Sequence, residues 1–319
     1  MGQTGSNDKR ETLATRALMP NDLGAARRIL ETSEFIYTRV APDELARMLA
    51  SRPAMGAFSV PAGPLARVTG GTLRAFLLVN ALVQPCAWLG AFGVTWSEGS
   101  DFAGYLDVLL PEIERAVAAR GARTLYYSGN DLPNDWLRPA LEARGFHIIT
   151  TLRAYDKDDY AIPSWGNTTL RVRPFARADA EGVVEVENAA FEPLWRYDAA
   201  GFVEVDDTYP YFVVAEDDQG IVGYQFNVVE RQMGFLVRIA VHPRAEGRGV
   251  GTRLMAEAIY YFEKQRARRI LLNTEERNVR AHRLYERFGF HTVPSRGFVL
   301  ARDIRDDIRN DTAPDGSAG

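Results

Sequence analysis

A glycine-rich loop between an apolar run and an amphipathic run is the feature that most constrains how this chain can fold. The apolar run ending at Val241 is rich in β-branched residues, and Pro243 ends it because proline has no amide hydrogen for a sheet ladder. Gly247, Gly249 and Gly251 follow at alternate positions, where missing side chains let backbone amides turn toward one point. Beyond the loop, apolar residues recur at helical spacing, and the amino end of a helix carries about half a positive charge. This strand, loop and helix start predict a site for a phosphate or pyrophosphate.

The spacing of the glycines separates this loop from two common nucleotide motifs. It lacks the Rossmann spacing, and no acidic residue ends a following strand about twenty residues on. It also lacks the Gly-Lys-Ser/Thr of a P-loop, so a purely structural tight turn is the remaining alternative for the loop taken alone. A second pattern lies downstream, where a predicted strand at 269–273 leads into a predicted helix that Gly289 is placed to end.

Together the two patterns resemble the GNAT superfamily of acyl-CoA-dependent N-acetyltransferases. The first reads V-x-P-x-x-x-G-x-G-x-G from Val241, and the second reads N-x-x-A-x-x-L-Y-E-x-x-G-F from Asn278, about thirty residues later. The resemblance covers about residues 169–302. It implies acetyl-CoA as co-substrate, an amine as acceptor and a mixed α/β sheet, which agrees with the alternation of predicted strands and helices.

Carried over residue by residue, the resemblance implies a cofactor site and one catalytic group. Loop amides would hold the CoA pyrophosphate, the strand ending at Val241 would lie along the pantetheine arm, and Asn278 would serve the cofactor. The implied cofactor-binding residues are Ile239, Ala240, Val241, Gly247, Arg248, Gly249, Val250, Gly251, Thr252 and Asn278. Tyr285 is the predicted acid for the departing thiolate, since a phenol has a pKa near ~10. Taken by position alone, Tyr285 also fits a core tyrosine, and Asn278 fits a helix N-cap.

Two departures from the family pattern bear on the chemistry. Glu246 stands where many members carry Arg or Gln, so it is not counted as a phosphate ligand, and Arg248 compensates in part. Members that acetylate protein amino termini often have a Glu where this chain has Asn273. The general base is therefore open, and the options are a water chain or one of the carboxylates Glu275, Glu204, Asp206 and Glu230.

The chain also repeats itself on the scale of a domain. Residues 15–22 echo 172–179, and residues 134–146 echo 278–290. We expect two tandem GNAT-like domains: a degenerate one at 12–155, a linker at 156–168 and a catalytic one at 169–303, with disordered tails at 1–11 and 304–319. In the first copy Tyr285 falls on Leu141, the alternate glycines are absent, and Asp101 brings negative charge to the pyrophosphate position. The first domain is therefore predicted to be structural, or to form one wall of the acceptor site, and not to bind acetyl-CoA productively.

Periodicity predicts the elements of the second domain. The expected strands are 169–175, 210–216, 220–230, 233–242, 268–274 and 295–302, and the expected helices are 178–191, 197–204, 250–265 and 277–288.

Composition limits the remaining function classes. The 319 residues are 46% hydrophobic and 25% charged, without an apolar run near the eighteen or so residues of a membrane span and without a signal-peptide segment, so no membrane partner is expected. A net charge of −4 without a basic stripe argues against nucleic acid. The single Cys86 fits a reducing cytoplasm, and the four histidines lack metal-ligand spacing, so no metal is expected. The oligomeric state stays open.

The resemblance implies that the segment from residue 192 to residue 218 lines the acceptor side, and eight acidic residues accompany one Arg196 there. Such a run attracts a cationic amine or is only a solvated face. Aromatic residues in this region either wall a pocket or pack in the core: Phe191, Trp195, Tyr197, Phe202, Tyr209 and Tyr211. The leading hypothesis is acetyl transfer to an amine of a small molecule within a ternary complex. The alternatives are a protein or peptide N-acetyltransferase and a non-enzymatic acyl-CoA sensor.

Overall fold

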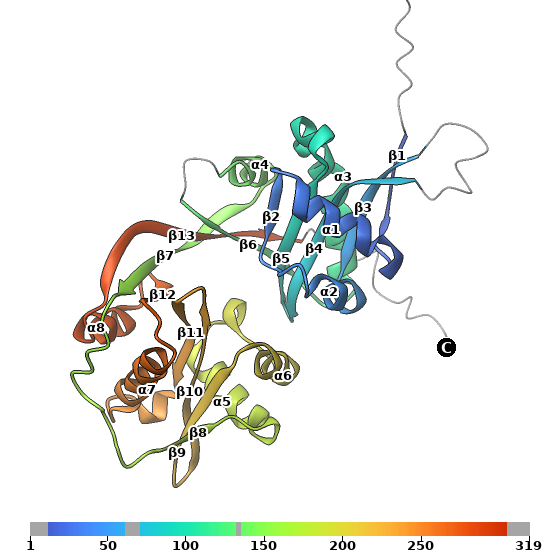
Figure 1. Cartoon of the computed structure of the whole chain (residues 1–319). Helices are drawn as coiled ribbons and strands as arrows, with labels where there is room; N and C mark the ends of the chain where they lie inside the picture. The colour runs from blue at the N-terminus through green and yellow to red at the C-terminus, as the bar shows by residue number, and fades with distance from the viewer. Residues whose placement is uncertain (1–11, 61–70, 132–134, 305–319) are drawn as a thin grey trace, which may run out of the picture. The chain divides into compact units, whose positions relative to one another are not determined.

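The structure, a computed structural model, describes residues 12–60, 71–131 and 135–304 (Figure 1). The predicted tails, apart from residue 304, lie outside the described residues. The chain divides into two compact units of mixed α/β structure. The first comprises Met1–Tyr127, Trp136–His147 and Ala301–Gly319, and the second comprises Ser128–Asp135 and Ile148–Leu300.

The first unit is built on strands in the order β1-β3-β4-β5-β6, with β2 paired to β5. These strands are β1 (Thr12–Ala17), β2 (Ile36–Thr38), β3 (Ala54–Val60), β4 (Thr72–Val83), β5 (Cys86–Val94) and β6 (Thr124–Asn130). The helices are α1 (Leu23–Thr32), α2 (Leu45–Ser51), α3 (Phe102–Ala118) and α4 (Leu137–Glu142). Strand β5 is buried along nearly all its length, as a continuous apolar run in a covered sheet requires.

The second unit has the strand order β13-β7-β12-β11-β10-β9-β8. Its strands are β7 (His147–Lys157), β8 (Arg171–Pro174), β9 (Tyr211–Asp217), β10 (Gly220–Glu230), β11 (Met233–Val241), β12 (Arg269–Glu275) and β13 (His291–Asp303). Its helices are α5 (Ala180–Ala190), α6 (Ala199–Thr208), α7 (Val250–Lys264) and α8 (Val279–Arg287). The predicted elements are present, with ends that differ by a few residues.

Three clusters of apolar side chains pack on the two faces of this second sheet. Residues of α5 and α6 pack with Phe212, Tyr224 and Phe226. Residues of α7 pack on the opposite face, with Val213 of β9 in one cluster and Leu236 of β11 in another. Neighbouring β9 residues such as Phe212 and Val213 therefore face different helix layers, as expected for a sheet covered on both faces.

Strand β13 begins at His291, earlier than the predicted start at residue 295. Its first half is largely exposed, and the continuous apolar run that indicates a buried strand begins only at Phe298. Backbone pairing therefore extends β13 over residues whose side chains show no hydrophobic pattern typical of a strand.

The structure does not divide the chain by a single cut at the predicted linker. Strand β7 pairs antiparallel with β12, with Leu152 opposite Glu275 and Lys157 opposite Ile270, and it falls in the second unit from residue 148 onward. Conversely, residues from Ala301 onward fall in the first unit, where the Ile304 amide donates to the Arg123 carbonyl (2.8 Å). A strand is assigned by the backbone groups that satisfy its hydrogen bonds. A linear comparison of two sequence copies does not reveal such an exchange.

The predicted repeat is visible in matching turns at the start of each copy. Arg16 makes two hydrogen bonds to the carboxylate of Asp22 (2.7 and 2.9 Å), and Arg173 makes two to Asp179 (2.6 and 2.8 Å). In both copies the same carboxylate also accepts a backbone amide three residues earlier, at 2.8 Å. In each copy, therefore, an arginine–aspartate pair holds the turn that leads into the first helix.

Candidate active site

Strands β11 and β12 open away from each other in the second unit. In the described residues they pair in parallel only at their beginnings, Met233–Phe235 with Arg269–Leu271. On its other edge β11 pairs with β10 along its length, but the register shifts so that Val237 is an extra residue. Such a bulge bends a strand, and Val237 is 39% exposed. The strands therefore separate beyond Phe235.

The hydrogen-bond pattern sets the direction of the β11 amides beside this opening. The His242 amide donates to the Val222 carbonyl (2.8 Å), and the antiparallel register continues from there through Ala240 opposite Tyr224. Because antiparallel bonding alternates along a strand, the amides of Ile239 and Val241 point away from β10, toward the β12 side. The predicted strand residues thus offer backbone donors to an extended ligand in the opening.

The glycine loop ends at the amino end of α7. Gly247 and Gly249 have φ of 72° and 77°, a left-handed conformation that favours glycine. Gly249 is the N-cap and has no side chain with which to cap the helix. The first intrahelical bond runs from the Arg253 amide to the Gly249 carbonyl (3.0 Å), so the amides from Gly249 to Thr252 belong to the uncapped first turn. The predicted loop residues therefore form a helix amino end with donors for an anion.

A backbone neighbour explains the glycine at position 249. The Asn167 amide donates to the Gly249 carbonyl (3.3 Å), and a Cβ added at Gly249 would lie 3.1 Å from that amide nitrogen. The segment before β8 therefore packs directly against the loop, and both space and φ require glycine at this position.

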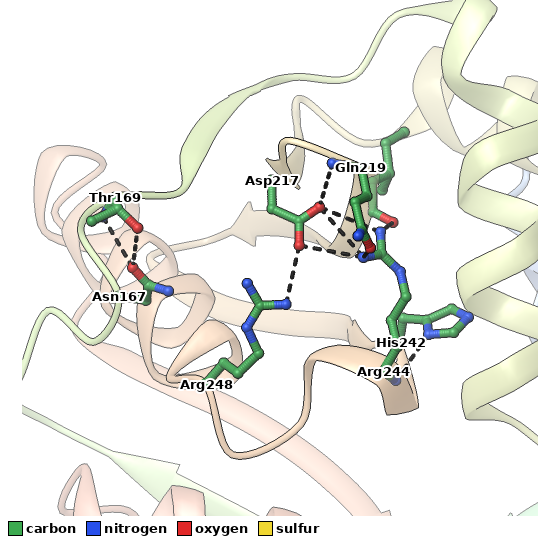
Figure 2. A network of polar contacts seen from close by, with 8 residues as sticks. Asn167, Thr169, Asp217, Gln219, His242, Arg244 and Arg248 are labelled. Carbon is green, nitrogen blue, oxygen red and sulfur yellow. Dashed lines mark hydrogen bonds and ion pairs between the residues drawn. The ribbon is translucent and has the colours of Figure 1, made fainter.

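Charged side chains around the loop are paired with one another (Figure 2). Arg248 lies 3.2 Å and Arg244 3.3 Å from the Asp217 carboxylate, and both point toward it from the loop. Glu246 is ion-paired with Arg280 of α8. Arg248 is half exposed, so a bound anion would compete with Asp217 for its guanidinium.

Tyr285 lies on α8 and is 4% exposed. Burial raises the pKa of its phenol, Tyr155 adds to this effect, and a hydrogen bond with Thr274 acts in the opposite direction. The Tyr155 ring meets the Tyr285 ring edge-on, with centroids 5.5 Å apart. The phenol is therefore kept neutral, in the form that can donate a proton.

Asn278 is the N-cap of α8, as its alternative interpretation predicted. Its Oδ1 accepts the Ala281 amide (3.1 Å), while its Nδ2 donates to the Thr274 hydroxyl (3.2 Å). Because Thr274 also bonds to Tyr285, these three side chains form one chain of contacts. The N-cap role leaves the proposed contact with the cofactor untested.

Sequence reasoning missed Thr274, Tyr155 and His282. The Tyr155 hydroxyl lies 2.6 Å from His282 Nδ1, and His282 Nε2 lies 3.0 Å from the Glu276 carbonyl oxygen. A carbonyl only accepts, so Nε2 carries the hydrogen and Nδ1 accepts from Tyr155. The position after Asn273 on a predicted strand could have indicated Thr274. No sequence signal places Tyr155 here, because it lies on the exchanged strand β7.

The candidate bases occupy different surroundings. Glu275 accepts from the Thr150 hydroxyl (3.1 Å) and is paired with Arg277 (3.1 Å). Glu230 is exposed at the hairpin between β10 and β11, whereas Glu204 and Asp206 lie on α6. The general base remains unassigned.

Most of the acidic run between residues 192 and 218 is paired or used as a cap. Glu192, Asp207, Glu216 and Asp217 form ion pairs with arginines, and Asp198 caps α6 by accepting the Gly201 amide at 2.7 Å. The pairing reduces the negative field that the sequence suggested. Among the aromatic residues, Phe202 is fully buried in the core and Tyr211 is stacked on Tyr261, whereas Phe191, Trp195 and Tyr197 gather around one arginine of β11.

The corresponding opening in the first unit contains a strand of the same chain. Among the described residues, strands β5 and β6 pair in parallel only at Cys86–Trp88 with Thr124–Tyr126, as β11 and β12 do at their beginnings. Beyond that point β2 pairs antiparallel with β5, from Ile36 opposite Gly93 to Thr38 opposite Ala91. Counted from the parallel pairs, these β5 positions correspond to residues 238–240 of β11.

Two further positions of the first unit also differ from the second. The Asp101 carboxylate lies over the first turn of α3, with Oδ1 2.7 Å from a Cβ added at Gly104. The Phe146 amide bonds to the Leu141 carbonyl (3.1 Å) as the Phe290 amide bonds to that of Tyr285 (3.0 Å). Leu141 therefore stands in the place of Tyr285, as the sequence comparison predicted.

Two features are absent from the described residues. No helix there is long and apolar enough to cross a membrane. The same residues contain no group of three or more His, Cys, Asp or Glu side chains arranged to hold a metal ion.

Comparisons with known proteins agree with this geometry. The profile of the acetyltransferase (GNAT) family matches residues 174–290. An uncharacterised N-acetyltransferase of Methanocaldococcus jannaschii is 32% identical over 121 residues, which are 37% of this chain and 76% of that protein. A mycothiol acetyltransferase of Mycolicibacterium gilvum is 28% identical over 203 residues, 57% of this chain and 65% of that protein. A solved tandem GNAT protein from the clavulanic acid biosynthesis pathway shares the fold, with a TM-score of 0.60, 14% identity, and coverage of 92% of this chain and 99% of its own. The chain belongs to the GNAT acetyltransferase family.

Proposed function

We propose that the second unit transfers an acetyl group from acetyl-CoA to the amine of a small molecule, directly within a ternary complex. The observation that carries this proposal is the opening between β11 and β12, which has the uncapped start of α7 after one strand and Tyr285 on the helix after the other. The α7 amides fit a pyrophosphate, and the β11 amides fit an extended arm that ends in a thioester.

The proposed reaction needs one proton acceptor and one proton donor. The neutral amine attacks the thioester carbonyl carbon, and the β11 amides around Ile239 to Val241 stabilise the oxyanion. As the carbon–sulfur bond breaks, the Tyr285 phenol donates its proton to the departing thiolate. The amine nitrogen loses its extra proton to water, which stands in for the unassigned base, and a proton from water then restores the Tyr285 phenol. The products are the acetylated amine and CoA.

A small-molecule acceptor is favoured by the relative named a mycothiol acetyltransferase, which matches over a longer span than the second unit alone. A peptide amino terminus is the second candidate for the acceptor. It is less favoured, because this chain has Asn273 where family members that acetylate protein amino termini often have Glu. The chain has one cysteine, the buried Cys86, which cannot form an internal disulfide, and this fits work in a reducing cytoplasm.

The first unit is proposed to be structural and not to bind acetyl-CoA. Strand β2 occupies the strand edge, Asp101 stands over the helix start, and Leu141 replaces the tyrosine. The first two changes put part of the chain where the second unit offers backbone amides, and the third removes the proposed acid. We therefore infer one acetyl-CoA site per chain.

The test is thiol release from acetyl-CoA by the full chain with polyamines, aminoglycosides, amino acids and peptides. We expect one amine class to drive turnover and Tyr285→Phe to lower kcat by about 10²-fold, within the range for loss of general acid catalysis. The binding constant of acetyl-CoA should change by less than about twofold, which separates loss of the acid from loss of cofactor binding. Turnover that is unchanged in Tyr285→Phe would contradict the assignment of the acid. Tight acetyl-CoA binding without thiol release by any class would favour the sensor alternative.

A further inference from the structure

A buried ionic network lies on the face of β11 opposite α7. Arg238 follows the bulge, and its Nη2 donates to Glu187 of α5 (2.7 Å) while its Nε lies 3.1 Å from the Tyr224 hydroxyl. Tyr224 in turn donates to Glu187. The Glu187 side chain is fully buried, and that of Arg238 is 12% exposed. Burial acts to lower the pKa of Arg238, but Tyr224 and Glu187 outweigh it, so its pKa is raised and the guanidinium stays charged.

The same arginine holds the segment between α5 and α6. Its Nη2 also donates to the Trp195 carbonyl (2.7 Å), and its guanidinium carbon lies 3.9 Å from the Phe191 ring centroid and 5.0 Å from that of Tyr197. Glu187 accepts the Tyr197 amide (2.9 Å) from the same segment. Residues 191–197 are thus attached to β11 through backbone, ring and charge contacts at once.

The segment is also attached beyond the end of β12. Glu192 is paired with Arg277, which lies between β12 and α8 (2.8 Å). Both side chains are more than half exposed, and exposed pairs of this kind contribute about 0–1 kcal/mol. The segment therefore has contacts on both sides of the opening, and its buried attachment is at Arg238.

We propose that Arg238, held by Glu187 and Tyr224, is a positioning residue that fixes residues 191–197 as the wall of the acceptor site. Its side chain lies on the α5 face of β11, whereas the glycine loop leads into α7 on the other face. An acceptor must reach the thioester from the side that the cofactor leaves free, and this segment lies on that side. This inference rests on the proposed acetyl transfer to an amine. It adds to that proposal the residue that holds one wall of the amine site in place.

The test uses the full chain with Arg238→Lys and Glu187→Gln. Lysine keeps the charge beside Glu187, but one ammonium cannot reproduce the planar fork that reaches Glu187, Tyr224 and Trp195 together. We expect KM for the amine identified by the panel to rise at least tenfold, with kcat and the acetyl-CoA Kd within about twofold. Glu187→Gln keeps the size of the side chain but removes the charge that pairs with Arg238, and it should likewise raise the acceptor KM while leaving kcat and the acetyl-CoA Kd within about twofold.

Arg173→Lys is the matched control. Arg173 also contacts two carboxylates, Asp179 and Glu216, but it lies on β8 and pairs with neither β11 nor residues 191–197. It should lower the melting temperature without raising acceptor KM. An unchanged KM in Arg238→Lys, or an equal loss of acetyl-CoA affinity, would overturn the proposal.

A second measurement needs no acceptor. Amide hydrogen exchange in the presence of acetyl-CoA should become at least tenfold faster over 188–199 in Arg238→Lys, with unchanged protection over 247–252. Uniformly faster exchange in both regions would also overturn the proposal, since it would indicate a scaffold role. If no amine is acetylated, the proposed function fails, and exchange alone decides whether Arg238 holds the segment.

Discussion

At the scale of single residues, burial of the Tyr285 phenol sets the pH range over which it can donate a proton. Its pKa is raised, so the protonated form persists through about pH 10, the ordinary value for tyrosine. The amine has the opposite requirement, because only its neutral form attacks. We therefore expect kcat/KM to rise with pH toward the pKa of the free amine and to show no fall below about pH 10. A descending limb between about pH 7 and 9 in the wild type that is absent from Tyr285→Phe would contradict this assignment.

At the scale of elements, the amino end of α7 depends on the conformation of Gly249. Alanine at φ 77° is strained by about 1–2 kcal/mol, and its Cβ would press on the Asn167 amide. We expect Gly249→Ala to weaken acetyl-CoA binding at least tenfold by calorimetry. Gly220→Ala is the control, since Gly220 also has positive φ but lies in the β9–β10 hairpin with open space around it. Equal loss of affinity in both variants would argue that strain alone is responsible.

The turn before α5 predicts a stability change at the same scale. The Arg173 hydrogen bond lowers the pKa of Asp179 against the effect of burial, so the stabilisation is present above the unfolded pKa near ~3.9 and is lost as pH falls below it. Asp179→Asn should cost about 1–3 kcal/mol at neutral pH, as expected for charged hydrogen bonds, and less near pH 3. Asp22→Asn should cost less, because Arg16 is more exposed than Arg173. Urea unfolding at both pH values measures the difference, and a pH-independent cost would contradict this interpretation.

At the scale of the whole molecule, the two copies are expected to differ in cofactor binding. Calorimetry of the full chain should give one acetyl-CoA per chain. In the Gly249→Ala variant, whose site in the second unit is weakened, no tighter site should appear in the first unit. A stoichiometry of two would contradict the proposal that the first unit does not bind acetyl-CoA. Leu141→Tyr should not restore a second site, because β2 and Asp101 would still occupy their positions.

The sequence predicted most of this architecture because its signals are local. Alternate glycines require left-handed backbone, as Gly247 and Gly249 show, and the apolar period of α7 and α8 follows from one face packing on a sheet. Even the match of Leu141 to Tyr285 could be read from the repeated Gly-Phe ending. These inferences needed only neighbouring residues and the knowledge of which conformations they allow.

Three features depended on the tertiary structure. Strand β7 brings Tyr155 beside Tyr285. Pairing with β10 sets the direction of the β11 amides. The side chain of Arg238 is buried and paired only because α5 brings Glu187 to it. Each involves residues far apart in the chain, whose pairing depends on which strand edges and helix faces meet. The sequence by itself determined the elements, the repeat and the glycine loop, because these follow from local conformational preference. Only the tertiary structure decided the partners of each side chain and which opening β2 occupies, because a long-range contact leaves no periodic trace in either of its segments.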